Sequence, residues 1–129
     1  MIVMQIDVIT IFPEMFPAVL GSSIMKRAQA SGRLRVGVHN LRNYTHDKRR
    51  TVDDRPYGGG PGMVMKPEPI FEAIEAVRGR CAHQARRPRD GVCQAILMGP
   101  QGEVLSAAIA EELAEASHLI IICGHYEGV

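Results

Sequence analysis

Three short glycine-rich segments hold the residues with the clearest potential for binding chemistry. They read RPYGGGPGM (residues 55–63), MGPQGE (98–103) and CGHYEG (123–128). Glycine lets a backbone come close to a bound molecule, so such segments suit recognition of a flat base or an adenosyl group by backbone hydrogen bonds and apolar contact. A tight turn is the simpler interpretation of each segment alone. Because two of the three directly follow predicted strands, together they favour a ligand site.

The glycine run at residues 58–62 matches neither common phosphate-binding motif. A P-loop requires a second glycine at the sixth position of its motif, where counting from Gly58 gives Met63. The dinucleotide fingerprint G-x-G-x-x-G also requires its third glycine at Met63, and it follows a strand, whereas this run follows a charged loop. The run is therefore not a standard phosphate cradle.

Metal binding and covalent catalysis have weaker support. Cys81, His83 and Cys93 are possible ligands, but their spacing matches no common zinc site, so we expect no metal. Cys123 ends an apolar strand, where a cysteine is usually an inert small hydrophobe.

The elements that must position these segments alternate between strands and helices. Apolar, partly β-branched runs predict strands at residues 3–12, 33–39, 94–99 and 118–124. Helical spacing predicts helices at residues 14–20, 22–32, 67–77 and 105–115. This order predicts one α/β domain over residues 1–129, with a mostly parallel sheet flanked by helices on both faces. Ligands bind beyond the carboxyl ends of such strands, which places residues 98–103 and 123–128 on one rim.

Several local patterns give sharper expectations. The strand at 94–99 is expected to be buried, and residues 78–91 are expected to form a basic, exposed loop. Residues 40–62 are polar and rich in charge and glycine, as expected of a long functional loop. Ser22 or Ser23 is expected to cap the second helix and Gly32 to end it. The apolar stripe of the last helix consists of Leu105, Ala108, Ile109 and Leu113.

Composition and charge bound the class of protein. The chain of 129 residues is 46% hydrophobic, enough for one folded core, and no apolar run is long enough to span a membrane. Its three cysteines suit a reducing cytoplasm. Residues 1–66 hold ten Lys and Arg against five Asp and Glu, and residues 67–129 hold five against nine. A basic first half suits a polyanionic partner, although a solvated face is the simpler interpretation.

Four stretches of the chain carry a close resemblance to a known family. They read DVITIFPEMF (residues 7–16), NLRNYTHDKRRTVDDRPYGGGPGMVM (40–65), GPQGEVL (99–105) and CGHYEGV (123–129). In this order they resemble the bacterial tRNA (guanine-N1)-methyltransferases of the SPOUT superfamily. The resemblance implies a trefoil-knot α/β fold and a cytoplasmic homodimer with active sites at the subunit interface. It also implies methyl transfer from S-adenosylmethionine to N1 of guanosine 37 in tRNA.

The resemblance carries over to individual residues. It implies that the cofactor is bound by Met98, Gly99, Pro100, Gly124, Tyr126, Glu127 and Gly128. It implies that Asp53, Arg55 and Gly62 face the tRNA near the target guanine. Lys48, Arg49 and Arg50 are then expected to contact phosphates, which position a nucleic acid without specifying its sequence.

Two departures from the family pattern limit what this chain alone is expected to do. His125 stands where the family usually has arginine. The family also continues past the position of Val129 with a segment that bears its presumed general base, a catalytic arginine and a third glycine-rich loop. N1 of guanine carries a proton that a carboxylate must remove. We therefore expect this chain alone to be inactive and its knot incomplete, with Glu127 as its only candidate catalytic carboxylate beside the cofactor segments.

Two other interpretations stay open at the level of sequence. The chain could be a non-enzymatic nucleic-acid-binding α/β module, which would present a basic loop and bind no cofactor. It could also be an incompletely folded fragment without a function of its own.

Overall fold

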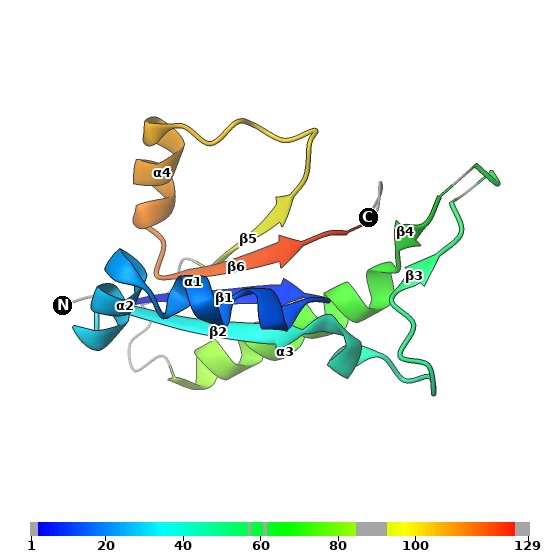
Figure 1. Ribbon diagram of the computed structural model, residues 1–129, viewed down its shortest axis with the longest axis horizontal. Helices are drawn as coiled ribbons and strands as arrows, with labels where there is room; N and C mark the ends of the chain where they lie inside the picture. Colours follow the sequence, from blue (N-terminus) through cyan, green and yellow to red (C-terminus); the bar gives the residue numbers. More distant parts are fainter. Residues whose placement is uncertain (1–2, 57, 61, 85–92, 126–129) are drawn as a thin grey trace.

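A sheet of four parallel strands in the order β2-β1-β6-β5 forms the centre of the molecule (Figure 1). The computed structural model describes residues 3–56, 58–60, 62–84 and 93–125, with the backbone alone described at residues 80–84. The strands are β1 (Met4–Thr10), β2 (Leu34–Asn40), β5 (Cys93–Met98) and β6 (His118–Cys123). The predicted α/β class and parallel sheet are confirmed. The strand order is new information, because β6 lies between β1 and β5 although it comes last in the chain.

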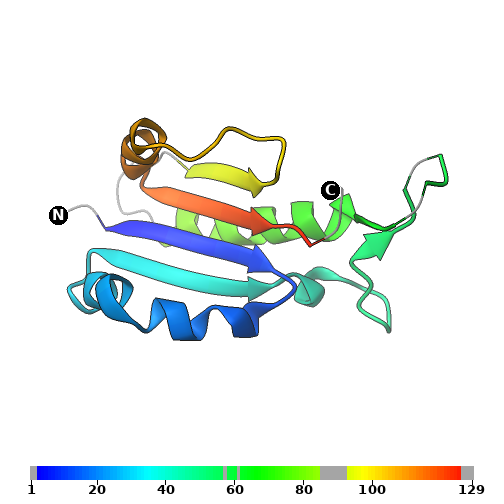
Figure 2. The ribbon, with the colours of Figure 1, turned by 45° about the horizontal axis from the view of Figure 1, so that its top comes forward.

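Helices cover both faces of this sheet (Figures 1 and 2). The 3-10 helix η1 (Pro13–Met15) and helices α1 (Pro17–Leu20) and α2 (Ser23–Ala30) lie over β1 and β2 on one face. Helix α3 (Pro67–Gln84) lies across the opposite face, and α4 (Ala107–Ala114) connects β5 to β6. Among the described residues, no helix is long and apolar enough to cross a membrane.

The main core lies between α3 and the sheet. Ile9 of β1 and Ile120 of β6 are fully buried, and they pack in one cluster with Ala73 and Val77 of α3. Burial of one large aliphatic side chain contributes about 1.5–3 kcal/mol, so this cluster stabilises the packing of α3 on the sheet. The remaining buried members of the cluster are Ile11, Leu41, Val52, Met65, Ile70 and Ile122.

Helix α2 begins and ends at the residues that its sequence predicts, but its first turn has no side-chain cap. Gly32 has a φ of +75°, and the amides of Gly32 and Arg33 bond back to the carbonyls of Gln29 and Ala28 at 3.1 Å each. This is the usual glycine-terminated helix end, so that prediction is confirmed. Ser22 occupies the N-cap position, but its side chain caps no amide. Its hydroxyl donates instead to the carbonyl oxygen of Ala18 at 2.6 Å.

Three local predictions are wrong. Residues 78–84 continue α3 instead of forming a loop, because Gly79 is the only helix breaker among them. Strand β5 is mostly exposed, since it lies at the edge of the sheet. In the predicted stripe of the last helix, Leu105 lies before α4 and is 71% exposed, and Ala108 is also exposed, so only Ile109 and Leu113 are partly buried.

The expected long loop at residues 40–62 contains ordered elements. It begins with the 3-10 helix η2 (Leu41–Tyr44) and includes β3 (Asp53–Asp54), which pairs with β4 (Val64–Met65) as a short antiparallel hairpin. The base of the hairpin is fixed in the core, since Val52 and Met65 are each 1% exposed and the Lys66 amide donates to the Val52 carbonyl at 2.7 Å.

Candidate functional site

Two of the predicted binding segments leave the sheet side by side. Strands β5 and β6 are parallel neighbours whose last paired residues are Met98 and Cys123. Gly99 and Gly124 follow these residues directly, so the two backbones emerge next to each other at the carboxyl edge of the sheet. The prediction that the two segments share one rim is confirmed for these described residues.

The predicted cofactor residues at this edge are open to solvent. Met98 is 56% exposed, and Gly99, Pro100 and Gly124 are also exposed. A Cβ added at Gly99 would meet no described atom within 4 Å. The edge therefore offers backbone groups that a ligand can approach without displacing a side chain. The other three predicted cofactor residues, Tyr126, Glu127 and Gly128, lie outside the described residues, as does the catalytic role expected of Glu127.

An aromatic contact joins the end of β6 to the turn after β1. The rings of Phe12 and His125 meet edge to face, with centroids 4.9 Å apart and planes inclined by 79°. The Phe12 amide donates to the hydroxyl of Thr10 at 3.0 Å, which fixes this turn. Edge-to-face pairs are a favoured aromatic geometry. The sequence assigned no role to His125, and no local signal points to this contact, because it joins residues from opposite ends of the chain.

The glycine run forms the outer end of the β3–β4 hairpin, which extends beyond the carboxyl ends of the strands (Figures 1 and 2). Gly58, Gly59 and Gly62 have φ values of +82°, +76° and +86°. These values lie in the left-handed region, where a side chain costs about 1–2 kcal/mol, so the backbone conformation favours glycine at these positions. A Cβ at Gly58 or Gly59 would meet no described atom within 4 Å, so packing within the chain does not require it.

The residues predicted to face tRNA lie on this hairpin and on the loop before it. Asp53 is half-buried at the base of the hairpin, whereas Arg55 and Gly62 are exposed toward its end. The Arg55 amide donates to the Asp54 carboxylate at 2.7 Å. The Arg55 guanidinium has no hydrogen-bond partner among the described residues. The predicted phosphate contacts Lys48, Arg49 and Arg50 are all exposed.

A carboxylate within the basic loop organises its backbone. Asp47 accepts the Thr51 amide at 2.9 Å on one oxygen and the Thr51 hydroxyl at 2.6 Å on the other. These hydrogen bonds, the hydroxyl first, lower the pKa of Asp47 below its ordinary value. The loop lies beside a hollow of about 180 Å³, which is lined by Tyr44, Thr45, His46, Asp47, Thr51, Lys66, Glu68, Pro69 and Glu72.

A second polar cluster, which the sequence did not predict, lies inside the sheet. Asp7 of β1 is 5% exposed, and its two oxygens lie 2.6 Å from His39 Nε2 of β2 and 2.7 Å from His118 Nε2 of β6. Gln5 Nε2 donates to the same carboxylate at 3.2 Å, and Cys93 Sγ of β5 lies 3.3 Å from His118 Nδ1. The cluster joins all four strands of the sheet.

The electrostatics of this cluster favour an ionised Asp7. Burial alone would raise its pKa, but the hydrogen bonds from His39, His118 and Gln5 together outweigh that effect and lower the pKa. A carboxylate only accepts hydrogen bonds, so both imidazoles donate through Nε2, and a neutral His118 then accepts the Cys93 thiol proton on Nδ1. The only signal in the sequence is one acidic residue within an apolar strand, which does not identify its partners.

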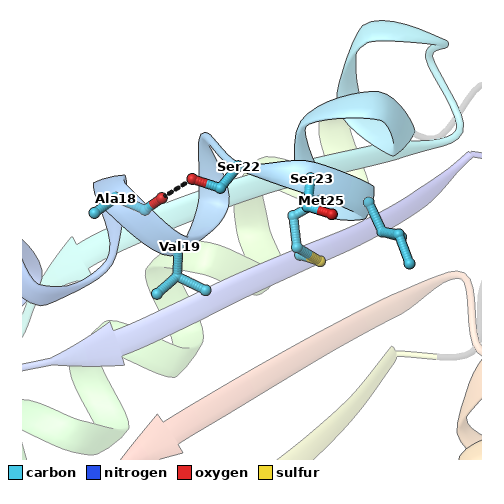
Figure 3. A pocket seen from close by; sticks show the side chains of 6 residues that line it. Ala18, Val19, Ser22, Ser23 and Met25 are labelled. Atoms are coloured by element: carbon cyan, nitrogen blue, oxygen red, sulfur yellow. Dashed lines mark hydrogen bonds between the residues drawn. The ribbon is translucent and has the colours of Figure 1, made fainter.

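An apolar hollow lies away from the carboxyl edge, on α1 and α2. Its volume is about 470 Å³, and Figure 3 shows Val19 near the Ser22–Ala18 hydrogen bond and Met25 beside Ser23. Val19 is 66% exposed and Ile24 is 73% exposed. None of the residues predicted to bind cofactor or tRNA lines this hollow.

The cysteines and possible metal ligands do not form a second reactive centre in the described part of the chain. No group of three His, Cys, Asp or Glu among the described residues is arranged to hold a metal ion. Burial raises the pKa of the Cys123 thiol, which keeps it protonated and is consistent with the inert role expected of it. The side chains of Cys81 and His83 lie outside the described residues.

The family profile described as tRNA (Guanine-1)-methyltransferase TrmD matches residues 4–129. The tRNA (guanine-N(1)-)-methyltransferase of Moorella thermoacetica is 54% identical over 126 residues, which are 98% of this chain and 48% of that protein. The enzyme of the same name from Dictyoglomus turgidum is 49% identical and is matched over 47% of its length. The chain thus spans about half the length of the curated relatives that it matches.

The fold also matches a solved structure. The crystal structure of tRNA (m1G37) methyltransferase from Aquifex aeolicus superposes with a TM-score of 0.80 at 36% sequence identity. The match covers 98% of this chain and 53% of the Aquifex aeolicus chain.

Proposed function

Because this chain belongs to the tRNA (guanine-1)-methyltransferase family, we propose that its protein transfers a methyl group from S-adenosylmethionine to N1 of guanosine 37 in tRNA. The observation that carries the proposal is the paired exit of Gly99 and Gly124 at the carboxyl edge of the sheet. This is the edge at which parallel α/β sheets bind ligands. The hairpin with the predicted tRNA-facing residues extends beyond the same edge.

The described residues fit the cofactor that the family implies. Adjacent exposed backbones at Gly99, Pro100 and Gly124 suit an adenosyl group, which can be held by backbone hydrogen bonds and apolar contact. Met98 adds an exposed apolar side chain beside them. When bound, S-adenosylmethionine supplies an electrophilic methyl group. Tyr126, Glu127 and Gly128 complete the proposed set, on the basis of the family resemblance.

The proposed tRNA-facing residues suit recognition of guanine. A carboxylate such as Asp53 pairs with the donor edge of guanine, and an arginine such as Arg55 pairs with its acceptor edge. Gly62 lies near them on the exposed part of the hairpin, where its positive φ sets the backbone direction. Lys48, Arg49 and Arg50 lie on the loop before the hairpin, which suits contacts to the phosphates of the same tRNA.

We also propose that the protein acts as a homodimer in the cytoplasm, where its tRNA substrate is found. Large apolar side chains exposed on the described surface support association with a second subunit. They are Met15, Val19, Ile24, Phe71, Leu97, Met98, Val104 and Leu105, each more than half exposed.

Calorimetry tests the cofactor site. It is carried out on the full-length protein, which is encoded by the reading frame that contains this chain. S-adenosylmethionine and its demethylated product should both bind the wild-type protein. Gly99→Ala should weaken this binding about tenfold or more, because the added methyl group enters the ligand's space and meets no described atom of the chain.

Gly79→Ala is the matched control for this experiment. Gly79 lies in α3, where an added Cβ also meets no described atom within 4 Å, so cofactor binding should not change. Failure of the wild-type protein to bind either molecule would overturn the proposal and favour a nucleic-acid-binding module without a cofactor.

A further inference from the structure

The three cations of the basic loop, residues 47–51, are not equivalent in the structure. All three side chains are exposed, but the guanidinium of Arg50 donates to Asn43 Oδ1 at 3.0 Å. In the described part of the chain, Lys48 and Arg49 form no side-chain hydrogen bond or ion pair. The geometry therefore separates one cation that is engaged within the protein from two that point into solvent.

Arg50 is held at its backbone as well as at its side chain. Its φ is +53°, an unusual value for a residue with a side chain, which reverses the chain direction at this position. The Arg50 amide donates to the Asp47 carbonyl at 3.2 Å, and Arg42 Nη1 donates to the Arg50 carbonyl at 2.9 Å. The strained conformation is thus maintained by hydrogen bonds from both sides.

Asp47 closes the loop with both of its oxygens. One accepts the Thr51 amide and the other accepts the Thr51 hydroxyl, at 2.9 and 2.6 Å. The next residue, Val52, is 1% exposed, so this closure is connected directly to the core. His46, on the other side of Asp47, lies 2.7 Å from Glu72 of α3, which joins the start of the loop to the helix.

We propose that residues 47–51 form a prefolded phosphate clamp, in which Lys48 and Arg49 contact the tRNA backbone. Asp47 and Thr51 are positioning residues, and so is Arg50, in place of the phosphate contact suggested above for it. The proposal rests on the proposed tRNA-modifying function and specifies how this loop serves it. A loop that is already folded pays less conformational entropy when it binds, so its two free cations bind phosphates more tightly than they would from a flexible loop.

The clamp and simple electrostatics predict opposite changes in tRNA affinity when the charge of Asp47 is removed. Removing a negative charge from a surface that binds a polyanion should strengthen binding, because the charge repels phosphates. If Asp47 instead maintains the loop, Asp47→Asn should weaken tRNA binding, by about threefold to tenfold for a coupling of ordinary size.

The test measures tRNA affinity of the full-length protein across a series of salt concentrations. Thr51→Val removes the hydroxyl without changing the charge, so it should weaken tRNA binding as Asp47→Asn does. Thr51→Ser keeps the hydroxyl, so its tRNA affinity should equal that of the wild-type protein. Glu75→Gln is the matched control, since it removes an exposed carboxylate of α3 that has no described partner. It should leave tRNA affinity unchanged or slightly higher. Cofactor affinity should stay constant in all four variants.

The salt dependence separates positioning from a general loss of structure. Lys48→Ala should reduce the slope of log affinity against log salt by roughly 0.7–0.9, the value for one phosphate contact. In the Asp47→Asn background the same substitution should have a clearly smaller effect, because the lysine is no longer held in place.

The outcomes distinguish the clamp from the function on which it rests. Wild-type binding of tRNA with unchanged or tighter binding by Asp47→Asn would overturn the clamp and leave the methyltransferase function standing. Equal effects of Thr51→Ser and Thr51→Val would also overturn the clamp. No tRNA binding by the wild-type protein would overturn both.

Discussion

Asp7 accepts hydrogen bonds from imidazoles of the two neighbouring strands, and this geometry connects the stability of the sheet to pH. Its pKa is lower in the folded protein than in the unfolded chain. The unfolded state therefore binds the proton more readily, and acid favours unfolding. The stabilisation from this carboxylate is fully present above its ordinary pKa and is lost as the pH falls through the lower value of the folded state.

Asp7→Asn tests this dependence. The amide leaves one imidazole facing a second donor, so the free energy of unfolding at neutral pH should fall by about 1–3 kcal/mol. Below the ordinary pKa of an aspartate, the difference in the free energy of unfolding between the variant and the wild-type protein should become smaller. The reason is that the wild-type carboxyl becomes protonated and neutral, like the amide. Urea denaturation at a series of pH values measures both effects, and a gap that stays constant down to acid pH would contradict the account.

Gly37→Ala tests the space around the same carboxylate. A Cβ at Gly37 would collide with Asp7 Oδ1 and lie 3.0 Å from His39 Nε2. The cluster must then shift, so we expect a loss of about 1–3 kcal/mol in thermal or urea denaturation. Gly79→Ala in α3 should instead be neutral or stabilise the fold by about 0.5–1 kcal/mol, because alanine favours helix. Equal stability of the two variants would contradict the proposed packing.

This cluster also shows where prediction from sequence reaches its limit. Asp7 lies 32 residues from His39 and 111 residues from His118 along the chain. Local periodicity carries no information about pairs at such separations, and only the strand order β2-β1-β6-β5 brings them together. The acidic residue was visible in the sequence, but its partners were not.

At the scale of elements, the β3–β4 hairpin combines a fixed base with an exposed glycine-rich end. Gly59→Ala should favour a different backbone conformation, since a φ of +76° costs an alanine about 1–2 kcal/mol. The hairpin end is exposed, so the melting temperature should change little while tRNA affinity falls several-fold.

Gly60→Ala is the matched control for the hairpin. Gly60 has no positive φ, and its Cβ would also meet no described atom within 4 Å. Its effect on tRNA affinity should be much smaller than that of Gly59→Ala. Equal effects would show that the exposed surface, and not the backbone conformation, determines binding.

Elements with strong local signals were predicted well, and elements defined by their neighbours were not. The apolar run of β6 and the glycine after α2 were sufficient to predict a strand and a helix end. The exposure of β5 depends on its position at the sheet edge, which its apolar sequence does not reveal. Residues 78–84 extend α3 because helix propensity outweighs one glycine, although their basic composition suggested a loop.

At the scale of the whole molecule, the order of strands brings distant segments of sequence to one edge. Segments after β1, β5 and β6 meet there, and the hairpin that follows η2 extends beyond it. The shared rim of Gly99 and Gly124 was predictable because parallel strands present their carboxyl ends together. The ring contact between Phe12 and His125 was not predictable, because it depends on β1 and β6 being neighbours.

The exposed apolar side chains lead to a prediction about assembly. Light scattering coupled to size-exclusion chromatography should give the full-length protein twice the mass of one chain at micromolar concentration. The physical reason is the apolar surface on α1, α2 and the β5–α4 segment, which a second subunit would cover. A monomeric mass that does not change with concentration would contradict the proposed homodimer.

The most direct test of the account is methyl transfer itself. The full-length protein is incubated with S-adenosylmethionine and an unmodified tRNA that carries guanosine at position 37, and the nucleosides are analysed by mass spectrometry. We expect N1-methylguanosine at position 37, and none when that guanosine is replaced by adenosine. Absence of N1-methylguanosine from the guanosine-37 tRNA, with a folded protein, would contradict the account.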